Sequence, residues 1–197
     1  MKLFTKTTTA EEVTENLDLS GQIILVTGAT AGIGRETIRV LAMRGAHVLA
    51  TGRTVEKVIA ASSKMPGKIT PLALELTNLA SVNRCTSSVL EAGLLPDTVI
   101  CNAGVYPFGP LELVSGIEKV FFANFLGHFA LINDLIPAML ERGSGKFVHV
   151  SSDSAYKQAP ASGIDFAFRC CDKRWLVYFY NLTDFFSSIV CTFGKTF

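Results

Sequence analysis

The sequence predicts an α/β protein built around a doubly wound parallel sheet. Between Gln22 and Ser151, short runs of β-branched and other apolar residues alternate with longer stretches whose apolar residues have helical spacing. The short runs are almost continuously apolar, which is typical of strands buried on both faces. Alternation of this kind places helices on both sides of a parallel sheet. No linker rich in Gly, Pro or Ser and no internal repeat divides the chain, so we expect one domain.

Five strands are expected, each from a short β-branched or apolar run. The first, IILVTG, ends in a glycine, and the last, KFVHVSS, ends in two serines. In chain order, the expected strands cover residues 23–28, 47–53, 68–76, 97–104 and 146–152.

Four helices are expected in the longer stretches, where apolar residues recur every three to four positions. The first helix has a glycine at its C-terminal end, and the last is long and bent near Pro137. In chain order, the expected helices cover residues 33–45, 55–64, 79–93 and 113–140.

Composition excludes several classes of function. The chain of 197 residues suffices for one full core and is short for two domains. Its net charge of +1 gives no electrostatic footprint for nucleic acid. The five cysteines are odd in number and form no Cys-x-x-Cys pair, so neither a disulfide framework nor a metal site is indicated. The three histidines, among them His128, lie on apolar segments and are expected to be core or surface residues.

The two ends of the chain differ from its middle. Residues 1–20 contain no apolar run long enough for a signal peptide or spanning helix, so we expect a solvated lead-in and a cytoplasmic protein. Residues 21–165 carry the α/β pattern. Residues 166–197 are rich in aromatics, with Asn181 and Asp184 interrupting them, so no membrane insertion is expected. An amphipathic or docked core helix is the alternative for that tail.

The segment TGATAGIG (27–34) predicts a phosphate-binding turn. It follows the first expected strand and opens the first expected helix. Gly28 allows a tight turn, Gly32 lets the backbone approach a phosphate, and Gly34 permits close helix–strand packing. Free N–H groups at the helix start would then face a pyrophosphate. This context favours a Rossmann dinucleotide site over a plain glycine-rich turn.

The Gly-x-x-x-Gly-x-Gly spacing, with Asn102-Ala103-Gly104 ending the fourth strand, resembles the short-chain dehydrogenase/reductase family. Three further motifs match in order: LELTNLAS (74–81), with Glu75 where the family has Asp; NFLGHFAL (124–131), as in its retinol-dehydrogenase-like branch; and FVHVSS (147–152). The resemblance spans about residues 20–165 and implies an NAD(P)-dependent oxidoreductase acting on an alcohol or carbonyl. The residues expected to bind the cofactor are Gly28, Thr30, Gly32, Ile33, Gly34, Arg35, Arg53, Glu75, Leu76, Asn102, Ala103 and Gly104.

The end of the second strand, Thr51-Gly52-Arg53, favours NADP over NAD. An acidic residue there would hold the ribose 2′-hydroxyl and repel a 2′-phosphate. Arg53 can instead bind that phosphate through charge-assisted hydrogen bonds, and Arg35 adds positive charge nearby. The alternative is that both arginines are solvated surface residues.

The resemblance implies three catalytic residues. Asn124 would hold a proton-relay water, Ser152 (alternatively Ser151) would orient the carbonyl, and Tyr178 would donate or accept the proton. In the retinol-dehydrogenase-like branch an insertion separates the serine from the tyrosine. SGIDF (162–166) resembles part of that insertion, which puts Tyr178 in the catalytic place. The family places a lysine four residues after this tyrosine, but here that position holds Leu182.

Two functional hypotheses follow. The first is an NADP-dependent oxidoreductase with a small alcohol or carbonyl substrate. The second is a truncated, inactive relative that at most binds nucleotide or a partner. Leu182 favours it, and so does the expectation that the family's last strands have no room after Phe197. A frame shift or an alternative end of the coding sequence would explain both features. The resemblance also implies a homodimer through the long helix.

Overall fold

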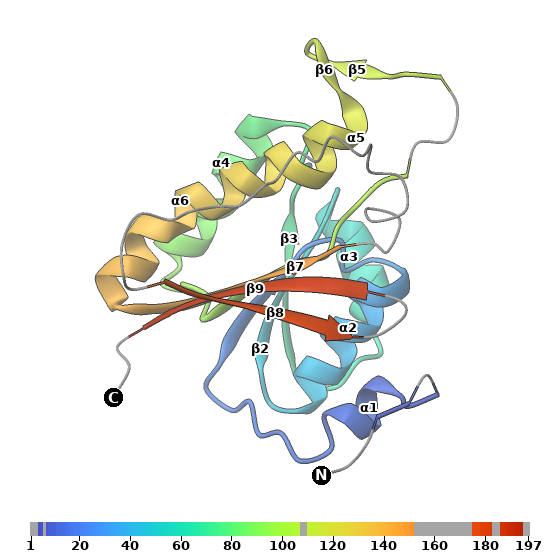
Figure 1. The fold of residues 1–197 in the computed structure, drawn as a ribbon, viewed down its shortest axis with the longest axis vertical. Coiled ribbons are helices and arrows are strands. Elements are labelled where there is room, and N and C mark those ends of the chain that lie inside the picture. The colour runs from blue at the N-terminus through green and yellow to red at the C-terminus, as the bar shows by residue number, and fades with distance from the viewer. Residues whose placement is uncertain (1–3, 6, 107–109, 152–174, 183–185, 195–197) are drawn as a thin grey trace.

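A mixed sheet runs through the middle of the protein (Figure 1). The computed structural model describes residues 4–5, 7–106, 110–151, 175–182 and 186–194. Within them the strand order is β3-β2-β1-β4-β7-β9-β8, and the first five strands are parallel. The predicted doubly wound parallel sheet is therefore confirmed. Those five strands are β1 (Ile23–Val26), β2 (His47–Gly52), β3 (Lys68–Ala73), β4 (Thr98–Cys101) and β7 (Ser144–Val150).

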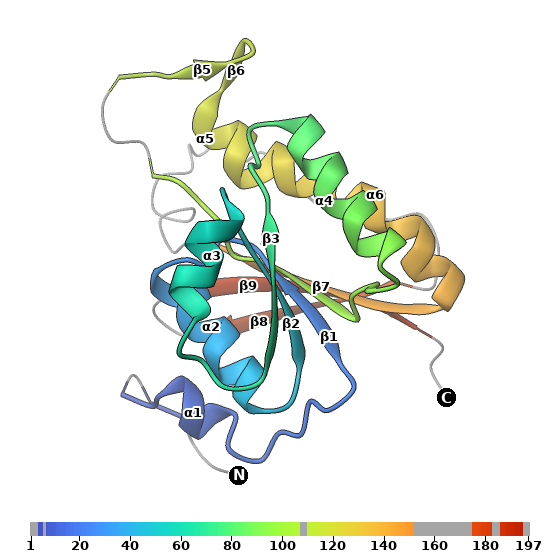
Figure 2. The ribbon, with the colours of Figure 1, turned by 180° about the vertical axis from the view of Figure 1, so that it is seen from behind.

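Helices cover both faces of the parallel sheet (Figure 2). On one face, α2 (Gly32–Met43) and α3 (Val55–Ser62) pack against Val26 and Val48. On the other, α4 (Leu79–Glu91) and α6 (Gly127–Arg142) pack against Leu25 and Leu49. Neighbouring strand residues thus enter opposite cores, which explains why the strands are apolar at almost every position.

The expected helix 113–140 is wrong at its start. Its first residues form a small hairpin of β5 (Leu113–Val114) and β6 (Ile117–Glu118). Ser115 and Gly116 form the turn with φ angles of 52° and 80°, the backbone that a two-residue hairpin needs. Glu118 then accepts hydrogen bonds from the N–H groups of Val120 (2.8 Å) and Phe121 (2.6 Å), so the helix begins only after the hairpin.

The helical stretch after the hairpin has three parts: α5 (Lys119–Phe121), a π-helix at Phe122–Leu126, and α6. It covers 24 residues, 119–142, and contains an 18-residue window with a mean hydropathy of 1.3, so by length and composition alone it could cross a membrane. The core helix of a globular domain has the same properties, and Leu131, Leu135 and Met139 are fully buried in the sheet-facing core. The expectation of no membrane insertion stays a prediction.

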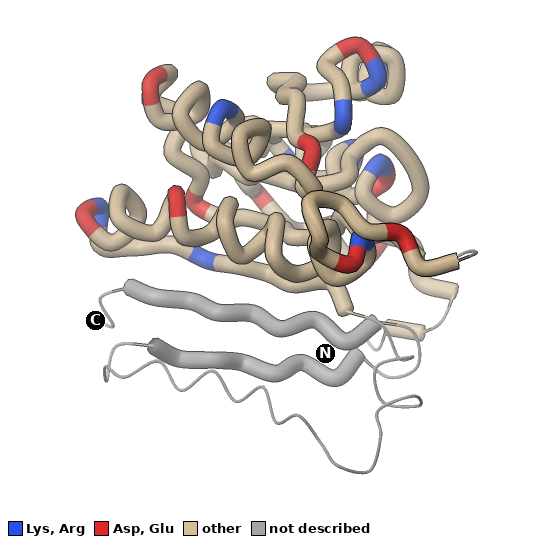
Figure 3. The backbone as a smooth tube through the Cα atoms, turned by 90° about the horizontal axis from the view of Figure 1, so that it is seen from above, with Lys and Arg blue, Asp and Glu red and all other residues tan. Residues whose placement is uncertain are grey.

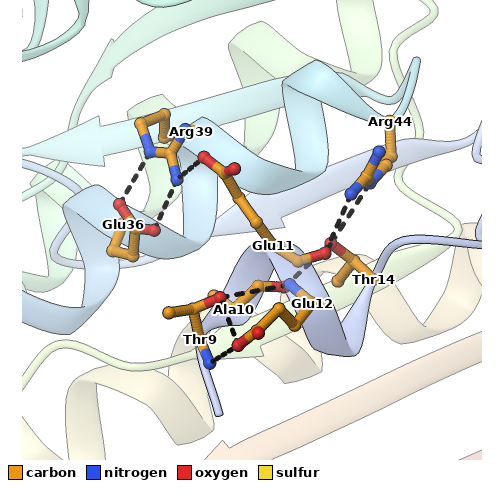
Figure 4. Close-up of polar contacts among 8 residues, drawn as sticks. All are labelled: Thr9, Ala10, Glu11, Glu12, Thr14, Glu36, Arg39 and Arg44. Carbon is orange, nitrogen blue, oxygen red and sulfur yellow. Dashed lines mark hydrogen bonds and ion pairs between the residues drawn. The ribbon is translucent and has the colours of Figure 1, made fainter. Parts of the chain in front are cut away.

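The N-terminal lead-in is more ordered than expected. It contains α1 (Ala10–Val13), capped by reciprocal hydrogen bonds between Thr9 and Glu12. Figure 4 shows this short helix beside α2, where Glu11 forms an ion pair of 2.6 Å with Arg39. The lead-in is therefore attached to the domain by polar contacts rather than fully solvated.

Beyond β7 the sheet continues with antiparallel strands. β9 (Phe186–Gly194) pairs with β7, and β8 (Trp175–Leu182) pairs with β9, where Tyr178 lies opposite Val190. Tyr178 thus lies on a strand, so this part of the tail does not form the amphipathic or docked helix that was the alternative for it. The run WLVYFYNL is dense in aromatic and β-branched residues, which favour strands.

Charged residues of both signs are interspersed along the part of the chain that the structure describes, as the coloured backbone in Figure 3 shows. This distribution agrees with the net charge of +1 and leaves no large region of one sign in that view.

Candidate nucleotide-binding site

The glycine turn lies between β1 and α2, at the carboxyl end of the parallel strands. Gly28 has a φ of +69°, and a Cβ there would come within 2.8 Å of the Cα of Ala103. A Cβ on Gly34 would collide with the carbonyl oxygen of Gly28 and the amide of Asn102. These glycines therefore let the turn and the Asn102-Ala103-Gly104 segment touch.

Gly32 faces open space. Its φ is +54°, and a Cβ there would meet nothing within 4 Å. Ala31, the residue before α2, makes no side-chain capping bond, whereas Thr54 and Asn78 cap α3 and α4. The first N–H groups of α2 therefore have no side-chain cap, and the space beside Gly32 is open. Free N–H groups at a helix N-terminus of this kind can bind a phosphate. The residues present fit a dinucleotide pyrophosphate here.

The Thr27 hydroxyl joins the turn to the end of β4. Its oxygen accepts hydrogen bonds from the N–H groups of Asn102 and Ala103, both at 2.9 Å. The side-chain amide of Asn102 returns a bond of 2.9 Å to the carbonyl oxygen of Thr27. The predicted residues Gly28, Gly34, Asn102 and Ala103 are therefore brought together by the fold, around a threonine that was not predicted.

Asn124 lies in the π-helix and faces the same segment. Its side chain accepts from the N–H of Val105 (2.8 Å) and donates to the carbonyl oxygen of Val105 (2.9 Å). It is also 3.5 Å from the position of a Cβ on Gly104. A π-helical turn is often found at functional sites. Here it places Asn124 next to the expected cofactor segment, although both polar groups of its side chain bind protein backbone.

The predicted residues that follow β2 and β3 lie at the same end of the sheet. Arg53 is exposed directly after β2, and Leu76 is buried. Arg35 donates from Nε to the carbonyl oxygen of Ala61 (3.1 Å), at the end of α3. The carboxylate of Glu75 accepts from the hydroxyl of Thr77 at 2.8 Å and from its N–H at 3.1 Å, so one of its oxygens is bound within its own turn.

Two further residues were missed as site residues. A Cβ on Gly127 would collide with the carbonyl oxygen of Leu76, so this glycine lets the asparagine-bearing helix approach the β3 segment. His128 is 3% exposed and hydrogen-bonds to Thr27 at 2.9 Å. Burial lowers the pKa of His128 to about 4. The NFLGH motif contains both residues, but sequence alone does not show which segments they would meet.

The catalytic predictions are placed only in part. Ser152 lies outside the described residues, directly after Ser151, and the insertion before Tyr178 lies outside them as well. Tyr178 and Leu182 both belong to β8, which pairs only with β9 among the described strands. The roles of Asn124, Ser152 and Tyr178 stay predictions.

The family model for short chain dehydrogenase matches residues 22–164. The chain belongs to the short-chain dehydrogenase family. Members of this family are oxidoreductases that use NAD(P), and the match covers the glycine turn, the Asn102 segment and Asn124.

Known family members agree with this assignment. The chain is 29% identical over 184 residues to a WW domain-containing oxidoreductase of Gallus gallus, covering 88% of this chain and 44% of the relative. It is 30% identical over 168 residues to human retinol dehydrogenase 13, covering 83% of this chain and 48% of the relative. It spans about half the length of these curated relatives.

A solved structure of a metagenomic short-chain oxidoreductase in complex with NADP is also similar. The two chains are 31% identical with a TM-score of 0.59, over 64% of this chain and 60% of the other. The complex of Pseudomonas aeruginosa RhlG with NADP is 30% identical, with a TM-score of 0.58 over 64% of this chain and 51% of that one.

Proposed function

We propose that this short-chain dehydrogenase binds NADP and transfers hydride between its nicotinamide and an alcohol or carbonyl substrate. The observation that carries the proposal is the glycine turn, which leaves open space at the uncapped start of α2. Its Thr27 hydroxyl is hydrogen-bonded to the N–H groups of Asn102 and Ala103. When bound, the cofactor would supply the hydride. The residues of this chain would hold its phosphates and orient it.

Arg53 supports NADP over NAD. It is exposed at the end of β2, a position where an acidic side chain would select NAD. Its guanidinium is not part of the core and could form charge-assisted hydrogen bonds with a 2′-phosphate. Arg35 is the lesser contributor, since its Nε already donates to the end of α3.

NADPH and NADH binding to the full chain, measured by the quenching of protein fluorescence, tests this proposal. We expect Arg53→Gln to weaken NADPH binding about 10–100-fold, the value of one charge-assisted bond, and to leave NADH binding nearly unchanged. Arg84→Gln, an exposed arginine on α4, is the matched control. Equal losses for both cofactors would contradict the assignment of Arg53.

A catalytically inactive relative is the second candidate, and Leu182 favours it. The family's lysine lowers the pKa of its tyrosine, and an unaided phenol in general, with a reference pKa of about 10, is a poor base near neutral pH. Leucine at position 182 can neither lower that pKa nor bind a ribose. Oxidation of NADPH with a panel of aldehydes separates the candidates: turnover excludes an inactive protein, and NADPH binding without turnover favours the inactive relative.

We also propose that the protein forms a homodimer through the outer face of its long helix. Phe121, Phe125 and Phe129 recur at every fourth position there and are between 37% and 49% exposed. Their rings stack at centroid distances of 5.3 and 6.3 Å. Sedimentation of the wild type and of Phe129→Glu tests this: a dimer that Phe129→Glu converts to a monomer is expected, and a wild-type monomer would refute it.

A further inference from the structure

Thr27 and His128 meet inside the protein although they are 101 residues apart in the sequence. The hydroxyl of Thr27 lies 2.9 Å from Nε2 of His128, and Nδ1 of His128 lies 3.1 Å from the carbonyl oxygen of Asn124. Both Thr27 and His128 are buried, at 0% and 3% exposure. One imidazole ring therefore touches the base of the glycine turn on one side and the π-helix on the other.

The partners of the ring determine where its proton lies. The carbonyl oxygen of Asn124 can only accept a hydrogen bond, so Nδ1 of His128 must carry a proton. The oxygen of Thr27 already accepts from two backbone N–H groups, which occupy both of its lone pairs. Its own proton remains to be donated, and Nε2 of neutral His128 is an acceptor at 2.9 Å. The alternative acceptor, the carbonyl oxygen of Ile100, is farther away at 3.4 Å.

This arrangement requires neutral His128. A protonated ring would point an N–H group from Nε2 at an oxygen with no lone pair left to accept it. The environment favours the neutral form, because burial, with a further contribution from nearby His149, lowers the pKa of His128. The chain of hydrogen bonds is thus complete in one direction only: Asn102 and Ala103 donate to Thr27, Thr27 to His128, and His128 to Asn124.

We propose that His128 is a positioning residue that holds the glycine turn, the Asn102-Ala103 segment and the π-helix in a fixed relation, and so pre-forms the nucleotide site. The inference rests on the proposed function for its link to NADP, but its geometry concerns the chain alone. Thr27 orients both N–H groups that begin the Asn102-Ala103-Gly104 segment, and its hydroxyl is oriented in turn by His128. Loss of the His128 acceptor would release that hydroxyl to rotate.

Two substitutions each preserve one of the two hydrogen bonds. His128→Gln places an oxygen near the position of Nε2 and can still accept from Thr27. His128→Asn places an amide near Nδ1 and can still donate to Asn124, but leaves Thr27 without its acceptor. His128→Leu removes both bonds at similar volume. If the hydrogen bond to Thr27 holds the nucleotide site in place, His128→Gln should keep near-wild-type amide exchange and NADPH binding. His128→Asn should not, although Gln and Asn are equally polar.

Nitrogen NMR of the imidazole in the full wild-type chain is the first experiment. We expect the neutral ring with its proton on Nδ1, and slow exchange of that proton. Hydrogen exchange at the amides of Asn102 and Ala103 is measured in the same samples. It should accelerate at least about 10-fold in His128→Asn and His128→Leu, and less than about threefold in His128→Gln, because a buried hydroxyl that loses its acceptor destabilises the bonds it makes.

NADPH binding completes the test. The dissociation constant should rise about 10-fold in His128→Asn and stay within about threefold of wild type in His128→Gln. A proton on Nε2, or equal behaviour of the Asn and Gln variants in exchange, would overturn the inference. If the wild type binds no NADPH, the proposed function fails, but the imidazole proton and the amide exchange of the unliganded chain still decide the role of His128. If His128→Leu does not fold, the Asn and Gln pair still provides the comparison.

Discussion

The side chain of Asn124 pairs with Val105 as one strand residue pairs with another. Its oxygen accepts from the Val105 N–H at 2.8 Å, and its nitrogen donates to the Val105 carbonyl at 2.9 Å. An amide is the only side-chain group that offers a donor and an acceptor in this geometry. Asn124 thereby holds the chain just past the Asn102-Ala103-Gly104 segment.

Asn124→Asp should destabilise the protein by about 1–3 kcal/mol, because a carboxylate oxygen would face the Val105 carbonyl in place of a donor. Asn133→Asp is the control: Asn133 is exposed on the same helical stretch, and among the described residues its side chain donates to the carbonyl of Phe129 alone. We expect less than about 0.5 kcal/mol there. Urea unfolding measures both, and equal losses would show that the pairing with Val105 contributes nothing.

Gly127→Ala should destabilise the protein by about 1–3 kcal/mol, since the new methyl group would overlap the backbone of Leu76. Gly127 has a regular helical backbone conformation that alanine can also adopt. The substitution therefore tests the steric overlap and not backbone strain. Gly104→Ala is the steric control for stability, because its Cβ would meet the nearest atom, Oδ1 of Asn124, at an ordinary 3.5 Å. If Gly127→Ala is as stable as wild type, the close approach of α6 to the β3 segment is not required.

Thr51→Val should leave stability unchanged or raise it by up to about 1 kcal/mol. The Thr51 hydroxyl oxygen is buried and has no hydrogen-bond partner within the described part of the chain. Thr27→Val is the opposite case, because it orphans the N–H groups of Asn102 and Ala103 and should cost about 1–3 kcal/mol or more. A clear destabilisation by Thr51→Val in thermal unfolding would show that its hydroxyl has a stabilising role after all.

Stability should fall as the pH drops from about 6.5 to about 4, because the folded protein keeps His128 neutral while the unfolded chain protonates it. The unfolded state then binds more protons, so stability rises with pH across this window, by about 3 kcal/mol from His128. His47 and His149 also have lowered pKa values and act in the same direction.

Urea unfolding of wild type and His128→Gln between pH 4 and pH 7 isolates the contribution of His128 to this slope. The variant should show a shallower dependence on pH, since the histidine pair that remains, His47 and His149, still titrates. Parallel curves for the two proteins would contradict a neutral, buried His128.

The attachment of α1 should weaken in acid. The hydrogen bond with Arg39 lowers the pKa of Glu36, so the Glu36–Arg39 contact stabilises the protein above the ordinary carboxyl value of 4.5 and is lost as the pH falls through the lower folded value. Arg39 also pairs with Glu11 of α1 (Figure 4). Protection of the amides of residues 10–14 should therefore fall on acidification.

Glu36→Gln should already show reduced amide protection of α1 at neutral pH and little further loss in acid. Glu91→Gln, an exposed carboxylate on α4 away from this cluster, should behave as wild type. High salt should reduce protection in wild type too, since these charged side chains are partly exposed, at 30% to 50%. Unchanged protection in Glu36→Gln would mean that α1 is held by other contacts.

The order of strands and helices, the glycine turn and the family were predictable from the sequence. Each depends on local patterns: apolar runs, helical spacing, and the spacing of glycines between a strand and a helix. The prediction failed where local signals compete. Residues 113–118 are apolar enough for a helix, but the Ser115-Gly116 turn forms a hairpin.

What the sequence by itself determined is therefore the order of strands and helices and the position of the glycine turn between β1 and α2, because apolar spacing and glycine spacing are properties of neighbouring residues. Only the tertiary structure decided that Thr27 meets His128, that Asn124 pairs with Val105, and that Gly127 lies against Leu76. These contacts join residues that are 101, 19 and 51 positions apart. The physical reason is that a polar group in the core must find a partner wherever the packed helices and strands bring one within reach.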